Sequence, residues 1–484
     1  MAEPSRSTRL VVIGAGPGGY AAAFRAADLG LDVTVVTDEE RLGGVCLLRG
    51  CIPSKALLEV AELVERAREA REFGIDFGDP TTDLDTLRDW AGGVVSELTD
   101  GLDTIADRWG VKIVNGRAAF ENSSAVHVSG DDGETTIEFD HAIIATGSRP
   151  IPLPGTEFGG RIMDSADALA LPDIPDRLLV VGGGYVGLEL GSVYAALGSA
   201  VTVVEMTDRL VPMVDDDLVR PLMKRLEDRF EAIRFETTVT ELSVTDEHVR
   251  AVLDDGSAAG EETFDRALVA IGRRPNTDDI GLDNTRVDVD DDGFIIVDEQ
   301  RRSSDDGIFA IGDAAGGQLL AHEAMHEGRV AAEVIAGKPV AFDKRAIPAV
   351  VYTDPQLAWC GVTEQHADSD DRELQISRYP WRASGRARTM GSSDGLTKLI
   401  TDAESGRILG VGIVGRGAET MIAEAVVAIE MGAVARDLAL AVAPHPTLSE
   451  TLHEAAEMQV AHPPHLPPPR GSGDGGSDDR APDD

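Results

Sequence analysis

Residues 8–36 read TRLVVIGAGPGGYAAAFRAADLGLDVTVV: an apolar run, a glycine-rich turn, an alanine-rich stretch and a second apolar run. The pattern predicts a strand over 8–13, a helix to about residue 30 and a strand over 32–36. Gly14 permits the tight turn, Gly16 lets the backbone approach a pyrophosphate, and Gly19 permits close packing of the helix, whose N-terminus offers donors to phosphates. These residues predict a βαβ unit that binds a dinucleotide.

The same pattern occurs again in the middle of the chain. A strand over 177–181 leads into the turn GGGYVG at 182–187, a helix to residue 197 and a strand over 200–204. Glu205 ends that strand, where an acidic side chain accepts hydrogen bonds from an adenosine ribose and repels a 2′-phosphate, so NAD is favoured over NADP. Two such units indicate two dinucleotides, or one duplication that lost a site. The glycines with the three roles are Gly182, Gly184 and Gly187.

Two cysteines, Cys46 and Cys51, lie in the segment GGVCLLRGCIPSK at 43–55. The chain has 3 cysteines in 484 residues, which excludes a stabilising disulfide framework, and a pair this close closes too small a loop to add much stability. In a reducing cytosol such a pair is more often catalytic or metal-binding. A zinc site needs further Cys or His ligands at short spacing, and none stands nearby. The pair is therefore predicted to be redox-active.

Composition limits the classes of partner. Acidic residues number 86 against 44 basic ones, a net charge of −42, and this field repels nucleic acid and anionic membranes. No uninterrupted apolar run reaches the roughly 18 residues of a membrane span, and no signal peptide is indicated, so we expect a cytoplasmic protein. The charge is interpreted as adaptation to a salt-saturated cytosol; a generally solvated acidic surface is the alternative.

Length and pattern shifts predict several domains. The first dinucleotide-binding domain is predicted over 1–150 and 277–344, where a short apolar strand ends in Gly312-Asp313, and the second over 151–276. Residues 345–460 are predicted to form an α+β domain, with strands over 349–352 and 396–401 and a helix over 419–431. The stretch 461–484 is rich in Pro, Gly, Ser and Asp and is predicted to be a disordered acidic tail.

With these motifs in view, the chain resembles the dihydrolipoamide dehydrogenases, within the disulfide-containing flavoprotein reductases, from residue 8 to about residue 460. Several ordered motifs are far more specific than one. The resemblance implies an α/β fold with two Rossmann-like dinucleotide-binding domains, for FAD and NAD, and a C-terminal α+β dimerisation domain. The segments that carry it are 14–19, 43–55, ATGSRP at 145–150, 182–189, IGRRPN at 271–276, 312–313 and HPTLSE at 445–450.

Roles for individual residues follow from the resemblance. Cys51 is implied to face the flavin, and Cys46 to exchange with substrate. Lys55 shares a helical face with Cys51; the resemblance places its cation at the flavin's reactive nitrogen, paired with Glu189 on the nicotinamide side, while Tyr185 shields the flavin. Asp313 would bind the ribityl chain. The implied cofactor-binding residues are Gly14, Gly16, Gly19, Asp38, Lys55, Thr146, Gly147, Ser148, Gly182, Gly184, Gly187, Glu205, Gly272, Gly312 and Asp313.

His445 and Glu450 supply the remaining chemistry that the resemblance implies. A dithiol reduces a disulfide as its thiolate, so it needs a base, and a histidine oriented by a carboxylate suits neutral pH. The resemblance implies that this pair comes from the partner subunit, so the active form is a homodimer. From the residue alone, a histidine before a proline has a turn or core role at even weight.

One further motif invites a metal interpretation. His322-Glu323-Ala324-Met325-His326 fits the HExxH zinc pattern. We expect no metal, because the segment follows Gly312-Asp313 where the resemblance implies a helix against the flavin, and no third ligand is evident. Cys360, between Trp359 and Gly361, is expected to be a small buried hydrophobe.

Two positions depart from the family pattern. Thr37 replaces the acidic residue at the end of the second strand, so we expect the FAD ribose to depend on Asp38 or on hydroxyl and backbone contacts. Leu48-Arg49 replaces a common Asn-Val pair and is interpreted as placing a cation near the disulfide, where it stabilises a thiolate or a substrate anion.

The leading hypothesis is oxidation of protein-bound dihydrolipoamide by NAD, through the Cys46-Cys51 disulfide and FAD. The lipoyl domain of a 2-oxoacid dehydrogenase complex or of a glycine cleavage system would be the partner. A glutathione-type disulfide reductase is the first alternative, disfavoured by Glu205, and mercuric reductase is disfavoured by the lack of an extra cysteine pair in the tail. A flavin-loaded scaffold without turnover is the second alternative.

Overall fold

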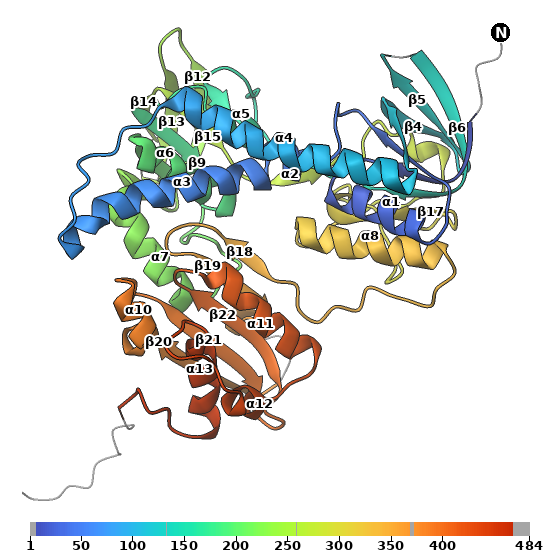
Figure 1. The fold of residues 1–484 in the computed structure, drawn as a ribbon. Coiled ribbons are helices and arrows are strands. Elements are labelled where there is room, and N and C mark those ends of the chain that lie inside the picture. Colours follow the sequence, from blue (N-terminus) through green and yellow to red (C-terminus); the bar gives the residue numbers. More distant parts are fainter. Residues whose placement is uncertain (1–5, 132, 258, 368–371, 468–484) are drawn as a thin grey trace, which may run out of the picture. The chain divides into compact units, whose positions relative to one another are not determined.

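The computed structural model describes residues 6–131, 133–257, 259–367 and 372–467 (Figure 1). The chain divides into two compact units. The first comprises Met1–Met213 and Leu222–Asp354, and the second comprises Val214–Pro221 and Pro355–Asp484. From residue 468 onward, the predicted acidic tail lies outside the described residues.

The first unit opens with the predicted βαβ motif. Strand β1 (Arg6–Ile13) runs into helix α1 (Pro17–Asp28) and strand β2 (Val33–Thr37), and β1 pairs with β2 in parallel. The sheet has the order β3-β2-β1-β6-β5-β4, and β17 pairs with β6. The further strands are β3 (Lys112–Asn115), β4 (Arg117–Asn122), β5 (Ala125–Gly130), β6 (Gly133–Ile144) and β17 (Ile308–Ala310).

Both faces of this sheet are covered. Leu10 and Val12 of β1 pack into a core with the alanines of α1, whereas Val11 and Ile13 pack into a second core on the opposite face. Successive strand residues point to opposite faces, so a continuous apolar strand is what a sheet buried on both sides requires. Helix α8 (Ala321–Ile335) lies beside α1 on the first face (Figure 1). The late segment thus completes the first fold, as predicted.

A second parallel sheet follows, with the order β11-β10-β9-β15-β8. Its central strands β9 (Arg177–Val181) and β10 (Ala200–Val204) flank helix α6 (Tyr185–Leu197) in the chain, and this confirms the second predicted βαβ motif. The other strands are β8 (Ile162–Met163), β11 (Ala232–Arg234) and β15 (Arg266–Val269). A three-stranded antiparallel sheet adjoins it: β12 (Thr238–Val244), β13 (Val249–Asp254) and β14 (Ala259–Phe264).

Two long helices stand between the two fingerprints in the sequence. Helices α3 (Cys51–Glu69) and α4 (Leu84–Trp109) pack against each other, and α3 also packs on α6. Among the helices of the described residues, none combines the length and hydropathy needed to cross a bilayer.

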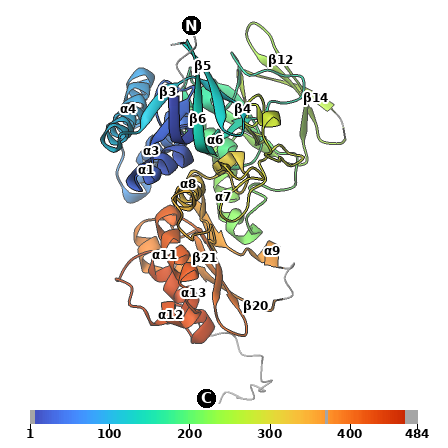
Figure 2. The same cartoon turned by 90° about the vertical axis from the view of Figure 1, so that its right-hand side faces the viewer.

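The second unit contains antiparallel strands in the order β19-β22-β21-β20, of which Figure 2 labels β20 and β21. They are β19 (Leu357–Gly361), β20 (Leu374–Pro380), β21 (Leu396–Asp402) and β22 (Ile408–Val414). Helix α11 (Ala418–Glu430) packs on β19 and β22, and helix α13 (Glu450–Val460) packs on β20 and β21. Helix α12 (Ala435–Leu440) contacts α13. This confirms the predicted α+β character of the C-terminal part.

Candidate functional site

The two cysteines of 43–55 meet at a helix junction. Cys46 lies in helix α2 (Gly44–Arg49), Cys51 is the first residue of α3, and both are free thiols. The hydrogen bond from Cys46 lowers the pKa of Cys51, burial opposes this shift, and the ammonium of Lys55 reinforces it. The same hydrogen bond, together with burial, raises the pKa of Cys46. A thiolate at a helix N-terminus is further stabilised by the helix dipole, so Cys51 is the sulfur that ionises first.

Lys55 is fixed by a carboxylate from the second fold. Its Nζ lies 2.8 Å from Glu189 Oε2 and 4.4 Å from the centre of the Tyr352 ring. Glu189 also accepts hydrogen bonds from the Ser54 hydroxyl at 3.2 Å and from the Tyr352 N–H at 2.9 Å. The Glu189 side chain is 4% exposed, and a charge buried this deeply is tolerated because it is paired and hydrogen-bonded. The ammonium is therefore held one helical turn from Cys51.

A cavity of about 730 Å³ reaches from the first fingerprint to these groups. Gly14 has φ +106°, and a Cβ there would lie 2.2 Å from Ala145 O, so a side chain is excluded. A Cβ on Gly19 would lie 2.0 Å from Gly14 O, whereas Gly16, the N-cap of α1, has open space. The buried Thr146 hydroxyl on the cavity wall has no hydrogen-bond partner among the described residues. An open backbone cradle with an unsatisfied hydroxyl fits a polar ligand with a pyrophosphate.

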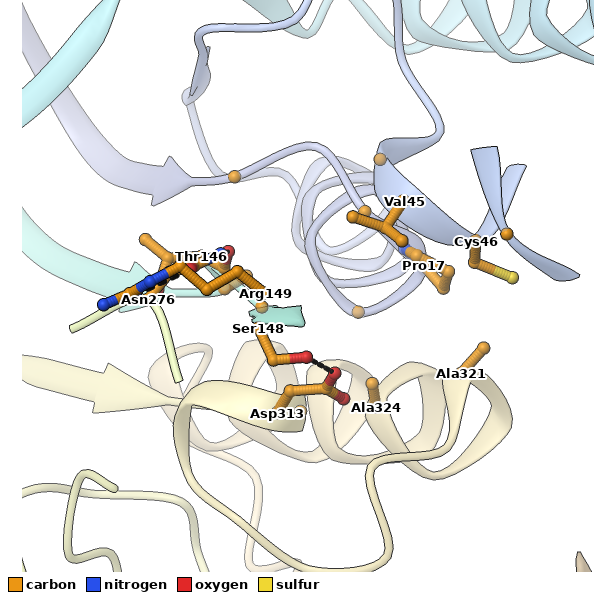
Figure 3. Close-up of a pocket in the computed structure, with 18 of the residues that line it drawn as sticks. Pro17, Val45, Cys46, Thr146, Ser148, Arg149, Asn276, Asp313, Ala321 and Ala324 are labelled. Atoms are coloured by element: carbon orange, nitrogen blue, oxygen red, sulfur yellow. Dashed lines mark hydrogen bonds between the residues drawn. The ribbon is translucent and has the colours of Figure 1, made fainter. Parts of the chain in front are cut away.

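A polar network lines the far wall of the cavity (Figure 3). The Ser148 hydroxyl donates to Asp313 Oδ2 at 2.5 Å, and Arg273 donates to that hydroxyl at 2.7 Å. Asn276 donates to the Thr146 carbonyl at 3.0 Å. Strand β7 (Ser148–Pro150) pairs with β16 (Arg273–Pro275), so the two family-like segments at 145–150 and 271–276 are brought together. Asp313 is thereby oriented by its neighbours and lines the cavity.

The second fingerprint has the same backbone geometry. Gly182 has φ +110°, and a Cβ there would lie 2.4 Å from Ala270 O, while a Cβ on Gly187 would lie 2.3 Å from Gly182 O. Gly184 is the N-cap of α6 and has open space. Glu205 Oε2 accepts the Gly183 N–H at 2.7 Å. The acidic residue predicted for the ribose is therefore fixed beside the phosphate-binding turn.

Tyr185 and Val186, at the start of α6, line the same cavity as the thiols. Glu189 does so as well. The first turn of the second dinucleotide fold thus reaches the chamber at whose wall the cysteines lie. A cavity shared by both folds allows electrons to pass between two bound cofactors.

The predicted pair of His445 and Glu450 lies in the second unit. His445 Nδ1 is 2.7 Å from Glu450 Oε1, and Glu450 Oε2 accepts the Thr447 N–H at 2.8 Å. Burial raises the pKa of Glu450, but these two hydrogen bonds outweigh it and lower the net pKa. The ionised carboxylate orients the imidazole through Nδ1, and the histidine side chain is 68% exposed. This arrangement allows Nε2 to accept a proton from an external group.

Comparisons with known proteins agree with this geometry. Residues 8–328 match the family described as pyridine nucleotide-disulphide oxidoreductase, and residues 347–456 match its dimerisation domain. The chain belongs to the pyridine nucleotide-disulphide oxidoreductases. A dihydrolipoyl dehydrogenase of Vibrio cholerae is 46% identical over 452 residues, which cover 93% of this chain and 95% of that protein. One of Halobacterium salinarum is 44% identical and covers 95% and 98%.

A solved structure, LpdA from Mycobacterium tuberculosis, is similar with a TM-score of 0.87 and 28% identity over 93% of this chain and 99% of that one. The cofactors of this pyridine nucleotide-disulphide oxidoreductase are FAD and NAD. The residues present fit both groups, since each fingerprint leaves an open cradle at its helix N-terminus.

One interpretation of the sequence needs correction. Arg49 was interpreted as a cation near the disulfide that stabilises a thiolate or a substrate anion. It lines the cavity with both cysteines, but its guanidinium is bonded by Glu39 of the segment after β2, and the cation that acts on the pKa of both thiols is Lys55. Thr37 is also engaged locally, because its hydroxyl accepts the Glu39 N–H at 3.2 Å. Asp38 lines the cavity, so a carboxylate remains available for the FAD ribose.

Two of the three side chains of the HExxH motif bond main-chain atoms. His322 Nε2 lies 2.7 Å from Pro348 O, and Glu323 accepts the Gln318 N–H at 2.9 Å.

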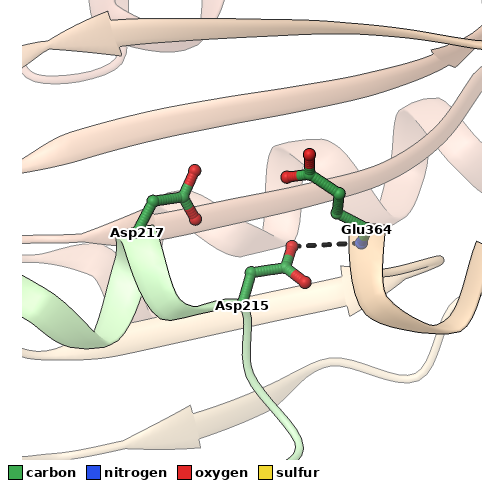
Figure 4. A group of neighbouring side chains, drawn as sticks. All are labelled: Asp215, Asp217 and Glu364. Carbon is green, nitrogen blue, oxygen red and sulfur yellow. Dashed lines mark hydrogen bonds between the residues drawn. The ribbon is translucent and has the colours of Figure 1, made fainter.

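A separate cluster of carboxylates lies in the second unit: Asp215, Asp217 and Glu364 (Figure 4). The fully buried ammonium of Lys398 donates to all three, at 2.8 Å from Asp215 and 3.0 Å from Asp217. The cluster already holds a cation, so it is an internal ion-pair network.

Several site residues were missed by sequence reasoning. Ser54, Arg273 and Asn276 lie inside the family-like segments, so their motifs gave a signal that no specific role was drawn from. Tyr352 gave none, because its contact with Glu189 joins positions 163 residues apart. The Glu39 contact with Arg49 was missed although the two residues are only 10 apart, because it depends on how the turn between β2 and α2 folds back.

Proposed function

We propose that this protein oxidises protein-bound dihydrolipoamide to lipoamide with NAD⁺ as the acceptor. The observation that carries the proposal is the Cys46 and Cys51 pair beside the Lys55–Glu189 ion pair, at the wall of a cavity that both dinucleotide folds reach. Relatives named dihydrolipoyl dehydrogenase, at 44–46% identity over nearly the whole chain, support the dithiol substrate.

The cysteines perform the exchange with substrate. In the oxidised protein, a substrate thiolate attacks Cys46, which breaks the Cys46–Cys51 bond and leaves Cys51 as a thiolate. The second substrate thiolate then attacks the mixed disulfide, so the substrate leaves as a cyclic disulfide and Cys46 departs as a thiol. The cysteine pair then holds two electrons and one proton of the dithiol, and the second proton passes to solvent through the proposed base His445. The lowered pKa of Cys51 makes it the better leaving group in the first step.

The chemistry that FAD supplies when bound is transfer of the electron pair from the reduced cysteines to the nicotinamide of NAD⁺. We propose that Gly14, Gly16, Gly19, Thr146, Gly147, Ser148, Gly312 and Asp313 hold FAD, and that Gly182, Gly184, Gly187, Glu205 and Gly272 hold NAD. Lys55, held in place by Glu189, supplies a positive charge beside Cys51 that stabilises its thiolate, and the carboxylate of Glu189 partly offsets this effect.

His445 and Glu450 are proposed to deprotonate the substrate dithiol in a homodimer, where the pair of one subunit serves the thiols of the other. The match of residues 347–456 to a dimerisation domain supports the dimer. The exposure of His445 supports the assignment, because a base that serves another chain must have free surface. The proposed domain boundaries are 1–150 with 277–344, 151–276 and 345–460.

The partner is proposed to be the lipoyl domain of a 2-oxoacid dehydrogenase complex or of a glycine cleavage system, in the cytoplasm. The charge of −42 and the relatives in halophilic archaea support adaptation to high salt. Strong salt screens repulsion between exposed carboxylates at the distances found on a protein surface.

The experiment is an assay of the purified protein in about 1 M potassium chloride, chosen for screening. NADH formation is followed with dihydrolipoamide and NAD⁺, and, in the reverse direction, NADH and NADPH are each offered with lipoamide or glutathione disulfide. We expect turnover with dihydrolipoamide and NAD⁺ and none with glutathione disulfide. A flavoprotein that NADH reduces but that ignores dihydrolipoamide would contradict the substrate and leave the family intact.

A further inference from the structure

His453, on helix α13, connects three parts of the second unit. Its Nε2 lies 2.8 Å from Glu424 Oε1, on helix α11. Its Nδ1 lies 3.2 Å from the carbonyl oxygen of Ala441, the residue that ends α12. The side chain is 13% exposed. A single imidazole therefore joins α11, the end of α12 and α13.

The two partners determine the charge of this ring. A carboxylate oxygen and a carbonyl oxygen are both acceptors, so each ring nitrogen must carry a hydrogen to bond them. A neutral imidazole has one N–H, whereas the imidazolium has two. The geometry thus requires the charged form. The Glu424 hydrogen bond also raises the pKa of His453, and the carbonyls of Ala441 and Leu438 add to the rise, while burial opposes it.

The Ala441 carbonyl that His453 bonds lies at the start of the segment that carries His445, the proposed base. Residues 441–449 connect α12 to α13, and His445 lies in the middle of them. The far end is fixed by Glu450, which bonds both His445 and the Thr447 N–H. Between the anchors the chain is open, with Val442 96% exposed. Glu450 and His453 are three residues apart on one helix and so lie on one face of it.

We propose that His453 is a positioning residue: as an imidazolium it anchors Ala441 and thereby fixes the segment that presents His445 to the dithiol. The inference rests on the proposed role of His445 as the base, but the charge of His453 and its hold on the segment are separate from turnover. Glu424 is the charged group that faces His453 from α11, and the carbonyls of Leu438 and Ala441 face it from α12.

The pH dependence follows from the direction of the pKa shift. A histidine whose pKa is raised in the folded protein contributes its anchoring fully below its ordinary pKa and loses it as the pH rises through the folded pKa. Release of the proton leaves one N–H for two acceptors, so the segment is freed on the alkaline side. We therefore expect kcat for dithiol oxidation to fall at alkaline pH by more than titration of the substrate alone would cause.

The first test compares pH profiles of dihydrolipoamide oxidation in the FAD-loaded dimer. His453→Gln removes the charge, His453→Arg keeps a permanent charge with several donors, and His465→Gln breaks another histidine–glutamate contact of α13, that with Glu454. We expect kcat at neutral pH to fall roughly ten- to hundredfold in His453→Gln, the scale of a misplaced catalytic group. We expect His453→Arg to recover most of it without the alkaline loss, and His465→Gln to stay near wild type.

The second test does not depend on turnover. Histidine rings labelled with ¹³C are titrated by NMR in the same holoenzyme variants, with His445→Gln and His453→Gln used to identify the two signals. We expect the His453 signal to titrate above an ordinary histidine and the His445 signal to shift in His453→Gln. An ordinary or depressed His453 titration, or a His445 signal indifferent to His453→Gln, would overturn the inference even if the protein oxidises dihydrolipoamide. Failure of turnover with both NMR results as expected would instead contradict the proposed function.

Discussion

The thiols and the histidine of the proposed active site are held in different ways. Around Cys51, Lys55 and the almost fully buried Glu189 are tied by hydrogen bonds to Ser54 and to the backbone of Tyr352. His445, by contrast, is two-thirds exposed and is oriented by Glu450 from the adjoining helix. The difference lies in how many groups hold each site. Cys51 is itself exposed, but the Lys55–Glu189 pair beside it is held by several groups of the first unit, whereas His445 is oriented by one carboxylate and has surface left for a group supplied by another chain.

The largest expected effect comes from a change at the thiols. Cys46→Ser removes the sulfur that substrate attacks, and a hydroxyl forms no disulfide, so dihydrolipoamide oxidation should fall by more than about a thousandfold. NADH formation measures the loss. Cys360→Ala, which changes a cysteine buried in β19 of the second unit, is the matched control and should retain most of the activity. Substantial turnover in Cys46→Ser would show that the thiols are not the redox centre.

A change at His445 should give the next largest effect. His445→Gln removes a general base and should lower kcat for dihydrolipoamide about 10²- to 10⁴-fold. Reduction of an artificial dye acceptor by NADH does not need this base and should be unchanged in the same variant. An equal fall in both reactions would mean that His445 acts on the fold or on cofactor binding. The thiol site and His445 would then not have the separate roles described above.

A smaller effect is expected at Glu205, which belongs neither to the thiol site nor to the His445–Glu450 pair. Glu205→Gln replaces a charged acceptor for the NAD ribose and for the Gly183 N–H, and hydrogen bonds to charged groups contribute about 1.5–3 kcal/mol. KM for NAD⁺ should rise roughly ten- to hundredfold, while KM for dihydrolipoamide should not change. Steady-state kinetics with each substrate varied in turn make this measurement, and an unchanged KM for NAD⁺ would remove Glu205 from the ribose site.

The smallest expected effect tests the electrostatics around Cys51. The ammonium of Lys55 lowers the pKa of Cys51, and the carboxylate of Glu189 raises it. Lys55→Met should therefore shift alkylation of Cys51 by iodoacetamide to higher pH, and Glu189→Gln should shift it to lower pH, each by about one pH unit. The reduced protein is alkylated across a pH series in each variant. Shifts of the same sign would contradict the assignment of opposite charges acting on one thiolate.

Local patterns carried most of the sequence-based prediction. Both fingerprints were recognised from their glycines, of which Gly14, Gly19, Gly182 and Gly187 admit no side chain. The strand bounds agree to within one or two residues, as for β1 and β2. The Cys46 and Cys51 pair was likewise local. Contacts between distant segments were not predictable: the Tyr352 N–H that binds Glu189 comes from 163 residues away. The contact of Arg49 with Glu39, 10 residues away, was missed for another reason: it depends on how the segment after β2 folds back, and no motif predicts that turn.

The most direct test of the account is the number of electrons that one chain accepts. The FAD-loaded protein is titrated with dithionite in the absence of oxygen, and flavin absorbance and free thiols are measured at each step. A flavin and a redox disulfide each take up two electrons, so the account predicts uptake of about four electrons per chain in the wild type and about two in Cys46→Ser. Uptake of about two electrons in both proteins would contradict a disulfide redox centre at Cys46 and Cys51.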